Sequence, residues 1–127
     1  MTEIDKLFRI NLASPEESFM KQEVIKLLLV MYLLRKFKKQ RHGIRIYTEF
    51  NIIDKRKADV YFENILNKEV IIFEIQKDYS LDWTKKLQED YKDLEIAYIN
   101  EIEIIPLKLR EFPDDIKGIN KKLEDYI

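Results

Sequence analysis

The chain has 127 residues, of which 46% are hydrophobic and 37% are charged. This length and apolar content suffice for one domain with a closed core, and they exclude a disordered tail. The 23 basic and 24 acidic residues leave a net charge of -1, so the overall charge does not favour nucleic acid. The chain contains no cysteine, which excludes disulfides, zinc–thiolate sites and thiol nucleophiles. The bias toward Ile, Lys and Glu is typical of heat-adapted proteins and also of AT-rich genomes.

The hydrophobic pattern gives no sign of a targeting or membrane segment. The first residues are acidic and mixed, unlike a secretory signal peptide. The longest apolar run, residues 27–34, is far shorter than the ~20 residues that span a bilayer. We therefore expect a soluble, cytoplasmic protein with no membrane partner.

A long helix is predicted first. Ser14-Pro15-Glu16-Glu17 has the form of a capping box with proline at the first helical position. Apolar residues continue through residues 19–37, and His42-Gly43 marks the end of the helix. Because its middle is apolar nearly all round, the helix needs cover on more than one side, which a sheet and a second subunit would supply. We therefore expect a homodimer.

Three strand-like segments follow, at residues 44–50, 58–63 and 70–76. A short helix capped by Ser80 or Asp82 comes next, and its apolar residues at helical spacing are expected in the core: Trp83, Leu87, Tyr91 and Leu94. Residues 95–99 and 103–107 have the pattern of a fourth and a fifth strand. Pro113-Asp114-Asp115 opens a last amphipathic helix. Nothing in the pattern marks a repeat or a boundary, so we expect a single domain over residues 1–127.

The most informative residues are Asp59 and Glu74, which lie on consecutive strands. If the turn is centred between Leu66 and Asn67, an antiparallel register places Asp59 opposite Glu74, with Cβ atoms ~5 Å apart. Two carboxylates that close in a half-buried sheet are unfavourable without a cation, and Mg²⁺ or Mn²⁺ suits such an all-oxygen site. A register slip of one residue would put the two side chains on opposite faces of the sheet.

The phrases ADVYF at residues 58–62 and VIIFEIQK at residues 70–77 resemble the PD-(D/E)XK nuclease superfamily, which includes restriction endonucleases and archaeal Holliday junction resolvases. In that pattern an aspartate begins one strand and a (D/E)-x-K tripeptide ends the next. The resemblance covers about residues 15–100. It implies an α/β, restriction-endonuclease-like core of a helix, a three-stranded antiparallel meander, a helix and a strand, with a mixed central sheet flanked by helices.

The resemblance also implies roles for individual residues. Asp59 and Glu74 match the catalytic acids of the motif, and they would hold a metal ion together with the backbone carbonyl of Ile75. Further acids are often present on the first strand or the first helix of such proteins. The candidates for a third ligand are, in order, Glu49, Glu17 and Glu23.

Two positions depart from the motif. Ala58 replaces its proline, and Gln76 occupies the place of its lysine. Gln76 can orient an attacking water by hydrogen bonds but supplies no positive charge, and strand alternation points the adjacent Lys77 to the other face. Lys86 on the following helix, or its neighbour Lys85, is the expected substitute.

Two basic clusters favour nucleic acid as the partner. Lys38, Lys39 and Arg41 lie at the end of the first helix, and Lys55-Arg56-Lys57 immediately precedes the strand of Asp59. A basic loop beside a metal site suits a phosphate backbone. Each cluster alone is also typical of a solvated surface, and the first one complements the helix dipole.

These observations together predict a Mg²⁺- or Mn²⁺-dependent endonuclease that hydrolyses phosphodiester bonds in DNA. Branched DNA, the substrate of resolvases, is left open, as is the choice between DNA and RNA. A homodimer would let two sites cut two strands. The alternative is an inactive module of nuclease fold that binds nucleic acid or protein, and the missing lysine of the motif is its main support.

Overall fold

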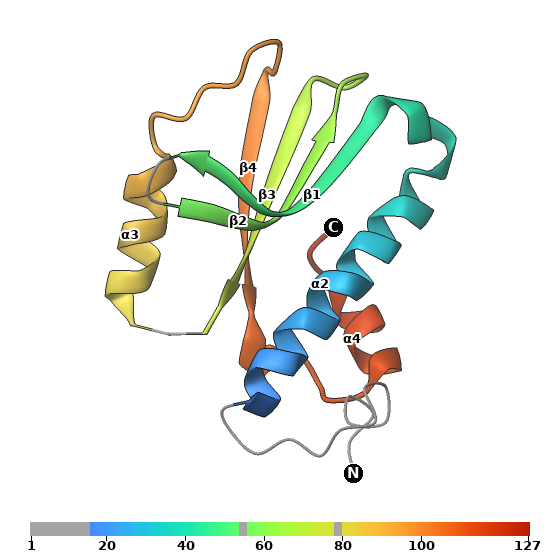
Figure 1. Ribbon diagram of the computed structural model, residues 1–127, viewed down its shortest axis with the longest axis vertical. Coiled ribbons are helices and arrows are strands. Elements are labelled where there is room, and N and C mark those ends of the chain that lie inside the picture. The colour runs from blue at the N-terminus through green and yellow to red at the C-terminus, as the bar shows by residue number, and fades with distance from the viewer. Residues whose placement is uncertain (1–15, 54–55, 78–79) are drawn as a thin grey trace. The chain divides into compact units, whose positions relative to one another are not determined.

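The computed structural model describes residues 16–53, 56–77 and 80–127 (Figure 1). Side chains are described from Phe19 onward. These residues form two compact units. One unit contains the described residues up to Lys38 together with Leu109–Ile127, and the other is Lys39–Lys108.

The first unit is helical. Helix α2 (Glu16–Lys36) packs against α4 (Ile116–Leu123), and the short 3₁₀ helix η2 (Leu109–Glu111) precedes α4. The Lys21 Nζ donates to the Phe112 carbonyl at 2.5 Å and pairs with Asp114 at 3.1 Å, which fixes the chain before α4 against α2. Within the described ranges, none of the helices is long and apolar enough to cross a membrane.

Helix α4 follows the predicted amphipathic pattern. Ile119 and Leu123 of α4 are fully buried, and Asp115 caps the helix by accepting a hydrogen bond from the Gly118 N–H at 2.8 Å. On α2, Leu27 and Met31 remain exposed although the middle of the helix is apolar on all sides. The homodimer that this apolar surface predicted stays a prediction.

The second unit is a four-stranded mixed sheet with one helix. Strands β1 (Ile44–Ile53), β2 (Arg56–Asn64) and β3 (Glu69–Gln76) form an antiparallel meander, and β4 (Glu101–Lys108) pairs with β3 in parallel. The strand order is β1-β2-β3-β4, and α3 (Leu81–Tyr91) connects β3 with β4. The prediction of an α/β protein with a mixed sheet is confirmed.

The register between β2 and β3 is the predicted one. Tyr61 pairs with Ile72 and Asn64 pairs with Glu69, so four residues form the turn. Asn64 is fully buried at the start of this turn, where its side chain donates to Gln40 Oε1 at 2.7 Å and accepts from the Asn67 N–H at 3.2 Å. These two hydrogen bonds hold the even-numbered turn and therefore the register.

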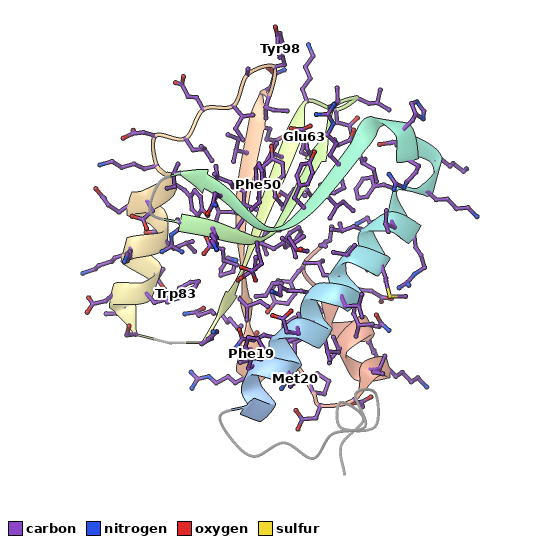
Figure 2. All side chains as sticks on the ribbon, in the orientation of Figure 1. Phe19, Met20, Phe50, Glu63, Trp83 and Tyr98 are labelled. Atoms are coloured by element: carbon purple, nitrogen blue, oxygen red, sulfur yellow. The ribbon has the colours of Figure 1, made fainter. Side chains whose placement is uncertain are left out.

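One face of the sheet packs against α3. Leu87 and Tyr91 of the helix form a buried cluster with Tyr61, Val70 and Ile72 of the strands. Partly buried residues surround this cluster, and Figure 2 labels two of them, Phe50 on β1 and Trp83 on α3. The helix begins where predicted, because the Ser80 hydroxyl caps it by accepting from the Trp83 N–H at 3.3 Å. The predicted core stripe of α3 is therefore confirmed for its central residues.

Two predicted boundaries are wrong. Helix α2 ends at Lys36 rather than at His42-Gly43, and the 3₁₀ helix η1 (Lys38–Gly43) leads into β1. Residues 95–99 are not a strand, because Tyr98 has a left-handed φ of 67° and the Ile99 N–H closes a turn on the Ile96 carbonyl. The apolar alternation there serves packing instead, since Ile96 and Ile99 lie at the margin of the α3 cluster. Tyr98 is 92% exposed (labelled in Figure 2).

The fourth strand starts later because the chain must first return to the beginning of β3. The backbone N–H groups of Asn100 and Glu101 donate to the Lys68 carbonyl at 2.8 and 3.2 Å, and Glu101 then pairs with Glu69. The segment predicted as a fifth strand is therefore part of β4.

We expect Asn64→Ala to lower the free energy of unfolding by about 1–3 kcal/mol, because it removes two hydrogen bonds at a buried position and leaves Gln40 without its partner. The matched control is Asn51→Ala, an exposed position of β1, which we expect to change stability little. Urea unfolding of the two variants measures the difference. Equal midpoints would show that Asn64 does not hold the turn.

Candidate functional site

Asp59 and Glu74 lie side by side where β2 and β3 stop pairing. The last ladder pair is Val60 with Phe73, and the same register places Asp59 opposite Glu74. Beyond that pair the Asp59 carboxylate takes the place of a strand partner, since its Oδ2 accepts the Ile75 N–H at 2.6 Å. The negative charge of Asp59 is close enough to raise the pKa of Glu74.

Glu74 is a buried carboxylate, with only 6% of the residue exposed. Its Oε1 accepts a hydrogen bond from Arg56 Nη1 at 2.5 Å. Its Oε2 and the Tyr91 hydroxyl beside the carboxylate are both buried, and neither makes a hydrogen bond of good geometry within the described residues. Burial raises the pKa of Glu74, and the nearby Tyr91 hydroxyl and Arg56 guanidinium oppose this effect only in part. The ionised form of Glu74 is therefore short of compensating positive charge.

Arg56 connects three elements at this site. It begins β2, donates from Nη1 to Glu74 on β3, and donates from Nε to Asp90 Oδ2 on α3 at 2.8 Å. Its guanidinium also lies over the Tyr91 ring, 5.7 Å from the centroid. The Arg56 side chain is 12% exposed, so this ion pair network is largely withdrawn from water.

Sequence reasoning missed this arrangement in two respects. Arg56 is predicted within a basic cluster that binds DNA, and its pairing with Glu74 and Asp90 at the start of β2 was not foreseen. Asp90 was not singled out, and Tyr91 was expected only as a core residue. Asp90 directly precedes Tyr91 on α3, and this position could have marked it as a candidate. Its contact with Arg56 could not be predicted, because it depends on how α3 is rotated against the sheet.

The other residues predicted to act in catalysis or metal binding differ in their burial and in the face of the sheet or helix on which they lie. Gln76 is buried, and strand alternation places it on the same face as Glu74. The Ile75 side chain is buried on the opposite face, and its N–H is bound to Asp59. Lys86 is exposed on α3, one helical turn before Asp90. Gln76 therefore belongs to the buried part of the site, and Lys86 to its rim.

None of the described candidates for a third acidic ligand forms a cluster with Asp59 and Glu74. Glu49 lies across from Asp59 by register, but it is exposed and has a left-handed φ of 51° in the middle of β1. Glu23 forms an ion pair with Lys26 in the helical unit, at 2.8 Å, and the side chain of Glu17 lies outside the described residues. In the described part of the chain, no three acids or histidines come close enough to hold a metal ion. The site is thus a pair of acids with an arginine.

The described residues of the sheet unit that are predicted to bind DNA lie near opposite ends of β1. Lys57 is exposed on β2 and pairs in register with Asn51, near the far end of β1. Lys39 and Arg41 are exposed in η1, which precedes the opposite end of β1. Lys38 is exposed at the start of η1, and Lys55 lies outside the described residues.

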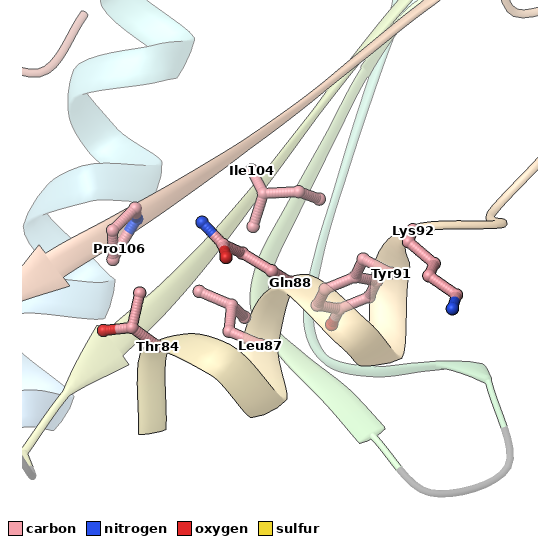
Figure 3. Close-up of a pocket in the computed structure, with 7 residues that line it drawn as sticks. All are labelled: Thr84, Leu87, Gln88, Tyr91, Lys92, Ile104 and Pro106. Atoms are coloured by element: carbon pink, nitrogen blue, oxygen red, sulfur yellow. The ribbon is translucent and has the colours of Figure 1, made fainter. Parts of the chain in front are cut away.

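A pocket of about 290 Å³ lies between α3 and β4 (Figure 3). Its apolar lining includes Leu87, Tyr91, Ile104 and Pro106. Tyr91 is shared between this pocket and the acid pair, and Pro106 pairs in register with Glu74. None of the residues predicted from the sequence to act in catalysis or binding lines the pocket, which therefore adjoins the predicted site without including its residues.

Comparison of the chain with models of protein families, with curated proteins and with solved structures finds no match in any of the three. The function must therefore be argued from the geometry of the site.

We expect Glu74→Gln to stabilise the metal-free protein relative to the wild type at pH 7, and to do so much less at pH 4. Folding raises the pKa of Glu74 above its ordinary value of 4.5. The folded state therefore binds the proton more tightly, and wild-type stability falls as the pH rises through the interval between the unfolded and the folded pKa. Thermal melts in EDTA across this pH range measure the difference.

The matched control is Glu89→Gln, because Glu89 is a surface partner of Lys92 with 70% of its side chain exposed. We expect this variant to differ little from the wild type in stability, because exposed ion pairs contribute little. A pH-independent difference for Glu74→Gln would contradict the account of Glu74 as a desolvated carboxylate.

Proposed function

We propose that the protein is a metal-dependent nuclease that hydrolyses phosphodiester bonds in DNA, with Asp59 and Glu74 as the acids that hold the metal ion. The observation that carries this proposal is the buried Glu74 carboxylate. It has a raised pKa and a buried oxygen that makes no hydrogen bond of good geometry within the described residues, although the Tyr91 hydroxyl is near, and it lies beside a second carboxylate. A hard divalent cation such as Mg²⁺ or Mn²⁺ relieves this combination.

The described contacts of the site contain more acidic than basic residues. Asp59, Glu74 and Asp90 are acidic, and Arg56 is the basic residue that pairs with Glu74 and Asp90. Partly buried charges of this kind are costly unless they are paired, so the excess favours a bound cation.

The order of the elements also supports a nuclease of the PD-(D/E)XK type. The chain runs from α2 through an antiparallel meander of three strands to α3 and then to a parallel strand, β4. Asp59 on the second strand and Glu74 on the third strand of the meander agree with what the resemblance implies, and this supports the proposal.

The chemistry follows from what each residue can do. A bound Mg²⁺ supplies a water of lowered pKa and offsets charge on the phosphate. Asp59 and Glu74 provide the oxygen ligands, and the Gln76 amide, buried on the same face, can orient the attacking water by a hydrogen bond. Water would add to phosphorus and lose a proton to solvent, the bond from phosphorus to the leaving oxygen would break, and the leaving oxygen would take up a proton from solvent.

A second candidate function is an inactive module of nuclease fold that binds nucleic acid or protein. The observation that favours it is the short ion pair between Arg56 and Glu74, which already gives one oxygen of the acid a positive partner. The neutral Gln76 at the position of the motif lysine points the same way. Metal binding and cleavage, measured separately, distinguish the two candidates.

We expect purified protein to cut DNA with Mg²⁺ or Mn²⁺ and not with EDTA, on at least one of linear duplex, single-stranded and four-way-junction substrates. Asp59→Asn should lower the rate by roughly 100-fold or more, because it removes a charge that the metal ion needs. Its amide oxygen can still accept the Ile75 N–H, so the fold is retained. Gel-based cleavage assays with a melting curve for each variant measure both effects.

The matched control is Asp93→Asn, an exposed position after α3, which should leave the rate unchanged. A folded protein whose melting temperature rises with Mn²⁺ but which cuts no substrate would favour the inactive module. A protein that neither cuts nor responds to Mn²⁺ would show that Asp59 and Glu74 do not hold a metal ion.

A further inference from the structure

The Arg56 guanidinium is held in a fixed position beside the acid pair. Glu74 accepts from its Nη1 and Asp90 accepts from its Nε, at 2.5 and 2.8 Å. Hydrogen bonds between ionised groups are short and strong, and two of them in different directions restrict the plane of the guanidinium. The Tyr91 ring supports one side of this plane. Arg56 is therefore held more rigidly than an arginine in a single surface ion pair.

The two ion pairs use only part of the guanidinium, although the Arg56 side chain is only 12% exposed. A guanidinium has five N–H donors, and the two hydrogen bonds to Glu74 and Asp90 use two of them. The remaining donors have no acceptor within residues 16–53, 56–77 and 80–127. A fork of N–H groups matches two oxygens of a phosphate group, which a lysine ammonium cannot do.

Glu74 links this cation to the proposed metal site. One of its oxygens binds Arg56, and the other is buried and makes no hydrogen bond of good geometry within the described structure. A metal ion on the second oxygen would share the carboxylate with Arg56, so an anion attracted by the metal ion would also be attracted by the guanidinium. Lys86, the cation expected from the sequence, lies instead on the exposed side of α3.

We propose that Arg56 binds the phosphate group of the DNA strand at the acid pair, and that it supplies the positive charge that Gln76 lacks. This inference rests on the proposed metal-dependent function. Without a divalent ion the site carries an excess of negative charge and repels phosphate. The contribution of Arg56 to DNA binding therefore arises only when the metal ion is bound.

The test compares Arg56→Met and Arg56→Lys with the wild type. The matched control is Arg45→Met, because Arg45 is 61% exposed and only loosely paired with Glu63, at 3.9 Å. Calorimetry measures the affinity for Mn²⁺. Fluorescence anisotropy measures the affinity for labelled duplex and four-way-junction DNA, in Ca²⁺ and in EDTA. Gel assays with Mg²⁺ give kcat/KM.

For Arg56→Met, the affinity for Mn²⁺ and the affinity for DNA should respond differently. The variant should bind Mn²⁺ at least as tightly as the wild type, because it loses a cation that competes for Glu74. Its DNA affinity in Ca²⁺ should fall about tenfold or more, and its kcat/KM roughly 100- to 1,000-fold. In EDTA the DNA affinities should be equal. Arg45→Met should differ from the wild type by less than about threefold in each measurement.

Arg56→Lys keeps a positive charge without the fork, and it serves as the test if Arg56→Met does not fold. It should bind Mn²⁺ as the wild type does and lose about tenfold in kcat/KM. Unchanged kcat/KM and DNA affinity in the variants would overturn the role of Arg56 and leave the metal-dependent function standing.

A parallel loss of Mn²⁺ binding and cleavage in both Arg56 variants would also overturn it, since it would show that Arg56 only maintains the fold. If the wild type binds Mn²⁺ but does not cut, the DNA affinity in Ca²⁺ still decides the role of Arg56. A wild type that binds neither Mn²⁺ nor DNA would overturn the proposed function and the role of Arg56 together.

Discussion

The pairing register of β2 with β3 is the constraint on which the candidate site depends. Side chains alternate between the faces of a strand, so a shift of one residue would move Glu74 away from Asp59 and from α3. The register is held at the distant end of the hairpin by the buried Asn64, whose amide closes the four-residue turn and reaches Gln40. A polar residue far from the acids therefore decides whether the acids meet.

Once the acids meet, the burial that α3 imposes determines their chemistry. Tyr91 is part of the apolar cluster that covers the sheet, and its hydroxyl is buried beside Glu74. The same packing removes water from the carboxylate and raises its pKa. Arg56 compensates one oxygen of Glu74, and Asp90 holds Arg56 in turn. The site is thus a balance between desolvation and charge pairing, with an excess of negative charge that a cation can neutralise.

The parts of the structure that could be predicted from the sequence are those with local causes. Ser80 and Asp115 mark helix starts because a short polar side chain caps the first turn, and the spacing of Leu87 and Tyr91 marks the buried side of α3. Residues 95–99 were wrongly predicted as a strand because their apolar residues lie in a loop that packs against the core. The left-handed backbone of Tyr98 is incompatible with a regular strand there. Apolar alternation reports burial, and burial is not confined to strands.

The sequence by itself determined the acid pair, since both the strands of Asp59 and Glu74 and the even length of the turn between them can be derived from local pattern. Only the tertiary structure decided which cation accompanies the acids. The rotation of α3 against the sheet brings Asp90 and Tyr91 to Arg56, and it leaves Lys86 at the rim. That rotation results from packing between residues far apart in the chain, for which a short sequence motif contains no signal.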